Sequence, residues 1–368
     1  MRELLSVTCF LSLFSLANGA VAATIETPQG ARQPQVAIDA DGNVHLTFGA
    51  DESVFYSCSS DDGATFSRPV KVGKLKSLAL GMRRGPRIAA STDSIVISAI
   101  GTSGDDEDGN LYTWRSVDQG SSWQEPLRVN DTDASAREGL HGMAAGPHGE
   151  VFCTWLDLRH KSTQIFGSRS TDGGATWSPN VRVYESPDGT VCECCHPSVA
   201  VDETGRVHVM WRNFLDGNRD MYLATSLDRG KSFGPAVKLG AGAWPLNACP
   251  MDGGAVAVAA KGKLVSVWRR EHEVFLTDGG LLKEKRLGVG MQPWVAANRK
   301  GTYAVWLSGR NGKLYSAAST KNQPLKLADR AQHPVVAGQA NAHGPVIVAW
   351  ESAGEAKPHV EVRRIDLQ

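Results

Sequence analysis

The stretch SLDRGKSF at residues 226–233 decides the fold, because closely similar stretches occur at residues 59–66, 116–123 and 170–177. All four follow the pattern S-x-D-x-G-x-[ST]-[WF]. In such a turn the Asp accepts hydrogen bonds from neighbouring N–H groups, and the Gly can adopt a positive φ. The aromatic side chain is suited to fill the space between sheets. Four copies, 54 to 57 residues apart, predict a repeated structural unit.

Each copy of the motif belongs to a longer unit with strand periodicity. HPSVAVD at residues 196–202 followed by GRVHVMW at 205–211 matches PQVAID at 34–39 followed by GNVHLTF at 42–48. The apolar residues alternate, as in Val207, Val209 and Trp211, which is typical of β-strands. Similar units start near Gly85, Gly139, Asp252, Gln292 and His333.

Four short antiparallel strands per unit, repeated in series, predict the blades of a propeller. A closed ring also avoids the exposed edges of one long sheet. We therefore expect an all-β fold, a seven-bladed β-propeller of four-stranded antiparallel blades, with six blades as the alternative. The last three units are shorter and lack the motif, and the final unit shows three clear strands. We expect residues 23–30 to supply its missing strand and close the ring.

The repeated motif matches the Asp-box, or BNR repeat, and the chain resembles the sialidase-like propellers from about Gln33 to Gln368. The resemblance implies a bacterial exported protein similar to exo-alpha-sialidases, with an acidic sugar as the class of ligand. In that family the Asp-boxes lie away from the active site, so we interpret them as locks on their own turns. The family's Arg-Ile-Pro motif reads Arg32-Gln33-Pro34 here, and no Tyr can be placed opposite a loop Glu.

The N-terminal residues 1–23 are predicted to be a signal peptide. Arg2 precedes an apolar run over residues 4–16, and small residues then offer an Ala-x-Ala cleavage site near Ala22 or Ala23. A retained anchor is the alternative. No second apolar segment is long enough to cross a membrane. We expect residues 24–368 to form a single sialidase-like propeller domain that is periplasmic or secreted, without a membrane span in the mature chain.

The charge balance argues against one class of partner. Lys and Arg together number 39, as do Asp and Glu, so the chain lacks the basic excess of a nucleic-acid binder. We expect no nucleic acid among its partners.

Sulfur-containing residues gather in the loops that enter the innermost strands of the fourth and fifth units. Cys and Met suit copper(I), and sets of Cys and His suit zinc, so these are the two candidate metals. A disulfide between Cys249 and one of the other thiols is an alternative in an oxidising compartment, and thiol–disulfide exchange is a third. Cys58 and Cys153 are expected to be small buried residues of strands. The predicted metal ligands are Cys192, Cys194, Cys195, His196, Cys249 and Met251.

Arginines are frequent in the loops of the same face. Guanidinium groups bind carboxylates well, and a sialidase holds the carboxylate of its substrate with three arginines. Pairing with acidic residues of the same loops, Asp157, Glu138, Asp216, Asp220 and Glu271, is the alternative. The predicted ligand-binding residues are Arg84, Arg137, Arg159, Arg212, Arg219 and Arg269.

The pattern leaves three functions open. A binding protein with a metal or another ligand at the channel rim is favoured by the thiols, for which sialidase catalysis has no use. An exo-alpha-sialidase-type glycoside hydrolase acting on acidic sugars is favoured by the arginines. A scaffold that binds a periplasmic protein partner is the third.

Overall fold

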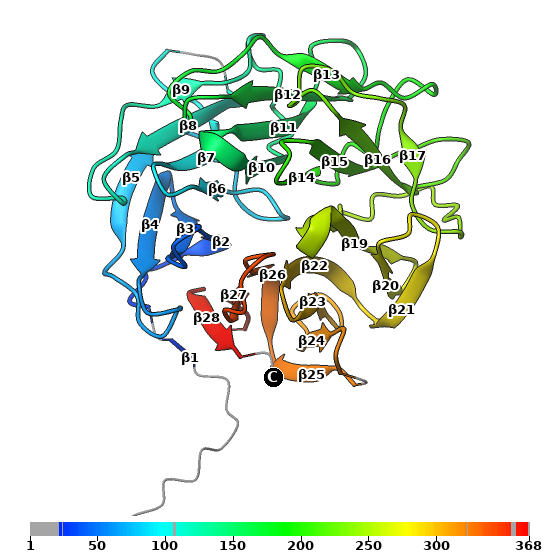
Figure 1. The fold of residues 1–368 in the computed structure, drawn as a ribbon. Helices are drawn as coiled ribbons and strands as arrows, with labels where there is room; N and C mark the ends of the chain where they lie inside the picture. The colour runs from blue at the N-terminus through cyan, green and yellow to red at the C-terminus, as the bar shows by residue number, and fades with distance from the viewer. Residues whose placement is uncertain (1–21, 24, 106–107, 322, 355–357, 367–368) are drawn as a thin grey trace, which may run out of the picture.

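Seven four-stranded antiparallel sheets surround a central axis in the computed structural model (Figure 1). The structure describes residues 22–23, 25–105, 108–321, 323–354 and 358–366. Blades 1 to 6 each use four consecutive strands, with the first strand innermost. The predicted seven-bladed, all-β propeller is therefore confirmed, and the alternative of six blades is wrong.

The strands of the first four blades have the following bounds: blade 1, β2 (Arg32–Ile38), β3 (Val44–Ala50), β4 (Ser53–Ser59) and β5 (Val70–Lys74); blade 2, β6 (Arg87–Ala90), β7 (Ile95–Gly101), β8 (Asn110–Ser116) and β9 (Leu127–Arg128); blade 3, β10 (His141–Ala145), β11 (Val151–Asp157), β12 (Gln164–Ser170) and β13 (Val181–Tyr184); blade 4, β14 (Ser198–Val201), β15 (Val207–Arg212), β16 (Met221–Ser226) and β17 (Val237–Lys238).

The remaining blades have these bounds: blade 5, β18 (Ala255–Ala259), β19 (Lys263–Arg270), β20 (Glu273–Asp278) and β21 (Glu284–Val289); blade 6, β22 (Met291–Asn298), β23 (Gly301–Leu307), β24 (Leu314–Ala318) and β25 (Leu325–Ala328); blade 7, β26 (Ala331–Ala337), β27 (Val346–Ser352), β28 (Val360–Ile365) and β1 (Ala22–Ala23). Among the described residues the helical segments are two single 3-10 turns, Pro147–Gly149 and Ala260–Gly262, in blades 3 and 5.

The beginning of the chain completes blade 7. Ala22 pairs with Arg363 and Ala23 pairs with Val362, so β1 becomes the outermost strand beside β28 (Figure 1). The strand that completes blade 7 therefore overlaps the predicted segment 23–30 only at Ala23, and both of its residues belong to the predicted signal peptide 1–23. The predicted signal peptide otherwise lies outside the described residues. Within the described part of the chain, no helix is long and apolar enough to cross a membrane.

Each Asp-box is a turn held by its own side chains. In blade 2 the Ser116 hydroxyl donates to Asp118 at 2.8 Å, and the N–H groups of Gly120 and Ser122 donate to Ser116 Oγ and Asp118 Oδ1 at 2.8 and 2.9 Å. The hydroxyl of Ser122 also donates to Asp118, and these hydrogen bonds, led by that one, lower the pKa of Asp118 to about 2. The same pattern of bonds surrounds the other three Asp-box aspartates, Asp61, Asp172 and Asp228.

The aromatic residue that ends each Asp-box packs against the preceding blade. Trp123 of blade 2 meets the edge of Tyr56 in blade 1, with 5.2 Å between the ring centroids. Trp177 of blade 3 donates from Nε1 to the Thr113 hydroxyl in blade 2 at 3.1 Å. The Asp-box therefore links neighbouring blades as well as fixing its own turn.

The two ends of the blades form faces of different character. Gly173 in the Asp-box of blade 3 donates its N–H to the carbonyl of Gly149, so the Asp-boxes share a face with the turns between first and second strands. Because the strands are antiparallel, the connections between blades and those between second and third strands lie on the opposite face, which we call the rim face. The predicted site residues lie on this rim face.

At the rim face a single buried arginine crosses the central channel. Arg83, in the connection from blade 1 to blade 2, donates to the carbonyls of Pro334 in blade 7 and Gln292 in blade 6, at 2.8 and 2.5 Å. Its guanidinium also lies 5.2 Å from the centroid of Trp294. Burial lowers the pKa of Arg83 to about 10, which still leaves it charged at neutral pH.

Candidate functional site

The loop that enters blade 4 folds three cysteines into one cluster. The N–H of Cys192 donates to the carbonyl of Arg212 at 3.0 Å, which anchors the start of the loop to β15. The N–H of Cys195 donates back to the carbonyl of Cys192, so the chain turns tightly between them. This turn brings the side chains of Cys192, Cys194 and Cys195 to one side.

The three thiols are close enough to share a metal ion. Their sulfur atoms are separated by 3.2 Å (Cys192 to Cys195), 3.7 Å (Cys192 to Cys194) and 4.0 Å (Cys194 to Cys195). Sulfurs arranged tetrahedrally around zinc at about 2.3 Å lie about 3.8 Å from one another. All three ligand atoms lie within 4.8 Å of one another, and in the described part of the chain this is the one group of its kind.

The charges around the cluster favour one thiolate. Hydrogen bonds from Cys194 and Cys195 hold the pKa of Cys192 well below its usual range, and the nearby positive charges of Arg212 and Arg219 act in the same direction. The Cys192 thiolate in turn raises the pKa of Cys194, and the nearby Cys249 thiol adds to this effect. Burial raises the pKa of Cys195.

Access to the cluster is limited to one side. Cys192 and Cys195 are buried, Cys194 is half-buried and Cys249 is exposed. All four are free thiols, so the alternative disulfide from Cys249 is not formed in the structure. Cys249 lies on the loop that enters blade 5, near Cys194, but its sulfur is not one of the three ligand atoms that lie within 4.8 Å of one another.

Like Cys249, the predicted metal ligands His196 and Met251 lie apart from the three-thiol group. The ring of His196 stacks on Trp294 across the channel, with 5.5 Å between centroids, and its buried Nε2 has no hydrogen-bond partner among the described residues. Met251 lies on the blade 5 loop and lines a separate cavity of about 270 Å³ at the channel mouth. Their role as metal ligands stays a prediction.

Arg212 holds the loops around the cluster together. Its buried guanidinium donates to three carbonyls, those of Asp252, Arg219 and Arg269, at 3.0, 2.7 and 2.8 Å. The Asp252 N–H donates to Cys195 Sγ at 3.3 Å, so the blade 5 loop touches the cluster directly. Each of the three guanidinium nitrogens of Arg212 thus has a backbone partner.

Two further predicted arginines lie beside Arg212. Arg219 donates to the carbonyl of Leu246 at 3.3 Å and lies over Phe214. Burial lowers its pKa, but the Cys192 thiolate more than offsets this and raises it. Arg269 donates to the carbonyl of Glu271 at 2.6 Å. Arg219, like Arg212, lies close to Cys192.

The remaining predicted arginines bind their own loops. Arg159 forms two hydrogen bonds with the carboxylate of Asp157, at 2.8 and 3.0 Å, and an ion pair with Asp131 at 2.9 Å. Arg84 donates to the carbonyl of Glu138 at 2.7 Å, and Arg137 donates to the carbonyl of Ala134. The structure therefore brings Arg212, Arg219 and Arg269 together around blades 4 and 5, while the other three lie around blades 2 and 3.

Two features of the rim face were not singled out from the sequence. Cys192 and Cys195 have the spacing C-x-x-C, which indicates two thiols on one turn and could have been found in the sequence. The cavity at the channel mouth is lined by Met82 and Met291 as well as Met251, and also by His333. Met82 and Met251 lie in the connections that enter blades 2 and 5, whereas Met291 and His333 belong to the innermost strands of blades 6 and 7, and no local motif marks them.

Comparisons with known proteins agree with the architecture. The family model described as "BNR repeat-like domain" matches residues 85–320. No curated protein matches the chain.

Solved structures match over nearly the full length. A protein of unknown function from Dyadobacter fermentans is 15% identical, with a TM-score of 0.60, and the match covers 95% of this chain and 98% of that one. An alpha-L-arabinofuranosidase from Fusarium graminearum is 13% identical, with a TM-score of 0.55 and coverage of 96% and 98%. A leech intramolecular trans-sialidase is 11% identical, with a TM-score of 0.51 and coverage of 96% and 70%. At these identities the likeness concerns the fold alone.

Proposed function

The chain belongs to the BNR repeat-like domain family, and we propose that it binds a soft metal ion, copper(I) or zinc, at the rim of blades 4 and 5. The single observation that carries the proposal is the convergence of Cys192, Cys194 and Cys195, whose sulfurs lie 3.2–4.0 Å apart. Thiolates are the ligands that copper(I) and zinc share, and three of them around one centre form most of a coordination shell.

Cys249 is the proposed fourth ligand. It is exposed on the loop of blade 5, near Cys194 and outside the group of three sulfurs. Four thiolates suit tetrahedral zinc, whereas three suffice for copper(I) in a trigonal arrangement. Arg219 and Arg212 lie close enough to Cys192 to compensate the negative charge of several thiolates around one ion.

The burial of Cys192 favours metal binding over disulfide exchange. An oxidoreductase needs its reactive thiolate to reach the disulfide of another molecule. Here the thiol with the lowered pKa is fully buried, and the exposed sulfur is that of Cys249 on the neighbouring loop. A small metal ion can reach a buried thiolate that a protein disulfide cannot.

Metal titration of the purified chain tests the proposal. Protein prepared without oxygen is titrated with copper(I) against a chromophoric chelator, and separately with zinc, and the bound metal is counted by elemental analysis. We expect one ion per chain and a loss of affinity of more than about 100-fold in Cys194→Ser, since even groups around the ligands change affinity 10–100-fold. Cys58→Ser, a half-buried thiol of blade 1, is the control and should bind as the unmodified chain does.

Removing Cys249 separates the two metals. We expect Cys249→Ser to weaken zinc binding strongly and copper(I) binding little, because only tetrahedral zinc requires the fourth thiolate. Failure of the unmodified chain to bind either metal, or equal affinity in Cys194→Ser, would overturn the proposal.

A further inference from the structure

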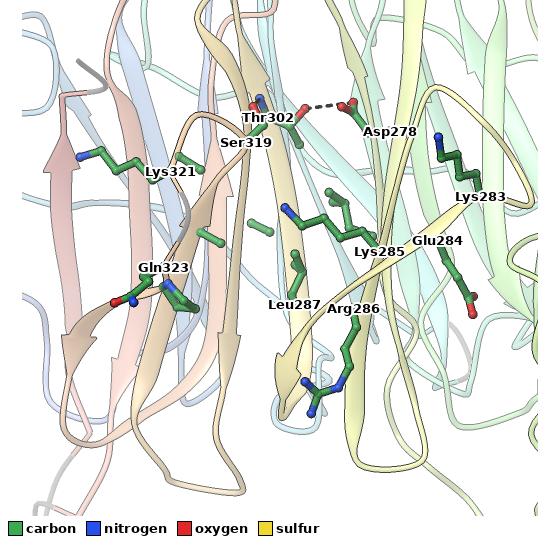
Figure 2. A pocket seen from close by; sticks show the side chains of 15 residues that line it. Asp278, Lys283, Glu284, Lys285, Arg286, Leu287, Thr302, Ser319, Lys321 and Gln323 are labelled. Carbon is green, nitrogen blue, oxygen red and sulfur yellow. Dashed lines mark hydrogen bonds between the residues drawn. The ribbon is translucent and has the colours of Figure 1, made fainter.

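A groove opens between blades 5 and 6, away from the rim face. Its volume is about 400 Å³, larger than that of the cavity at the channel mouth. Figure 2 shows it with side chains of β21 on one side and of blade 6 on the other. Its apolar surface comes from Leu276, Leu287, Ala304, Ala317, Ala318 and Pro324. No aromatic residue lines it.

Small residues line the groove at a position where blade 2 has large ones. In blade 2 the cross-strand pair Ile97–Trp114 faces blade 1 and is fully buried there. The corresponding pair of blade 6, in the same register of the second and third strands, is Ala304–Ala317. At this position the groove is therefore lined by two methyl groups in place of an isoleucine and a tryptophan.

The missing Asp-box removes a second aromatic side chain from the same place. In blades 2 and 3 the Asp-box tryptophan packs on one position of the preceding blade's third strand, Tyr56 for Trp123 and Thr113 for Trp177. Register places Leu276 at this position in blade 5, and Leu276 lines the groove. Blade 6 joins its third and fourth strands by a connection without the motif, so Leu276 has no aromatic residue above it.

The groove has a basic border. Lys283, Lys285 and Lys321 are exposed there, and none forms an ion pair with a described residue. The acidic side chains of the border are already neutralised. Glu284 pairs with Arg270 at 2.7 Å, and Asp278 pairs with Lys263 at 2.7 Å.

We propose that this groove binds an acidic segment of a partner protein through one of its tryptophan or phenylalanine side chains. The aromatic ring would lie between blades 5 and 6, at the place that corresponds to that of Trp123 between blades 1 and 2. Flanking carboxylates would face the three lysines. A sugar is a poorer fit, because sugar sites commonly offer an aromatic platform and this groove has none. The groove lacks an aromatic residue that its ligand can supply, and its positive charge favours an acidic ligand.

Fluorescence polarisation with defined peptides tests this proposal. The probe is a short labelled peptide with one Trp flanked by Asp and Glu, and its partners are the same peptide with Trp→Ala and one with Lys in place of the acidic residues. We expect saturable binding of the first peptide, weakened by added salt, and at least about tenfold weaker binding of the other two.

Variants of the chain locate the binding. The double change Lys283→Glu and Lys285→Glu should weaken binding of the acidic peptide at least about tenfold. Lys71 is an exposed lysine of the outermost strand of blade 1, and Lys71→Glu should leave this binding unchanged. Ala317→Trp should fill the groove and abolish binding. If Ala317→Trp does not fold, the charge variant and the Trp→Ala peptide still test whether the groove binds an acidic segment through its aromatic residue. Absence of saturable binding, or equal binding by all variants, refutes the proposal, and neither result bears on the thiol site.

Discussion

Blades 1 to 4 join their third and fourth strands through Asp-box turns, whereas blades 5 and 6 use connections without the motif and blade 7 takes its fourth strand from the beginning of the chain. All seven sheets have four antiparallel strands. Their contacts differ, because each Asp-box places an aromatic side chain on the blade before it. Where blade 6 lacks that side chain, a groove of about 400 Å³ remains. The Asp-box is thus a packing device between repeats, and its loss creates room that a ligand can use.

The largest effect is expected where an Asp-box glycine touches the preceding blade. Gly120 has a φ of +84°, and a Cβ there would lie 2.1 Å from the ring of Tyr56. Gly120→Ala should lower the free energy of unfolding by about 3–4 kcal/mol, from the left-handed backbone and the overpacking together. Urea unfolding followed by circular dichroism measures it.

Gly189→Ala separates the two contributions. Gly189 has a φ of +87°, but a Cβ there would meet no atom within 4 Å. We expect a cost of about 1–2 kcal/mol, from the backbone conformation alone. Equal costs at the two glycines would show that the Asp-box turn does not press against blade 1.

Removing an Asp-box aromatic residue should lower the free energy of unfolding somewhat less than Gly120→Ala does. Trp177→Ala deletes a half-buried side chain between blades 2 and 3 together with its hydrogen bond to Thr113. The expected loss is about 2–3 kcal/mol, below the range for a fully buried Trp. Thr113→Val, which removes the hydrogen bond and keeps the shape, should cost about 1 kcal/mol, and both are read from urea unfolding. A loss below about 0.5 kcal/mol in Trp177→Ala would contradict the role given to the motif.

The opposite change is expected at the groove. Ala317→Leu adds apolar volume where blade 6 has the small pair Ala304–Ala317, and should raise the free energy of unfolding by about 0.5–1 kcal/mol. The same change at Ala349, which is fully buried in blade 7, should destabilise the chain by overpacking. A destabilised Ala317→Leu would mean that the groove cannot accept an added side chain.

The smallest effect concerns acid stability. The pKa of Asp118 is lowered to about 2, below its value of about 3.9 in an unfolded chain. Its stabilising contribution is therefore present above pH 4 and is lost as the pH falls through about 2. Asp118→Asn cannot titrate and should show a weaker dependence of the urea midpoint on pH between 4 and 2. An unchanged dependence would indicate that the turn does not depend on the ionised carboxylate.

The sequence predicts the fold best in blades 1 to 4, which carry the Asp-boxes. The motif marks the third and fourth strands of blades 1 to 4, but no such signal marks β21 and β25, which nevertheless complete blades 5 and 6. Ring closure was expected from residues 23–30, and pairing with β28 uses Ala22 and Ala23. Such pairing depends on residues more than 300 positions away, which local patterns do not reveal.

The candidate site was predicted in part. The loops of blades 4 and 5 meet as expected, and three thiols converge. The direction of His196 was not predictable, because its ring stacks on Trp294 of blade 6, a residue distant in sequence. Nor was the role of Arg212, which binds three carbonyls instead of a carboxylate. These partners are backbone carbonyls, which every residue has, so the residue types in the sequence do not indicate them.

Arg83 gives the ring a mechanical property. It lies in the connection between blades 1 and 2, which have Asp-boxes, and donates to the carbonyls of Gln292 and Pro334 in blades 6 and 7, which have none. Its side chain therefore links these parts of the ring across the central channel. Outward breathing of blades 6 and 7 would have to break two hydrogen bonds from a buried cation, which are stronger than those of a neutral donor. One side chain thus ties the connection between blades 1 and 2 to blades 6 and 7, so movements of these two parts of the ring are coupled.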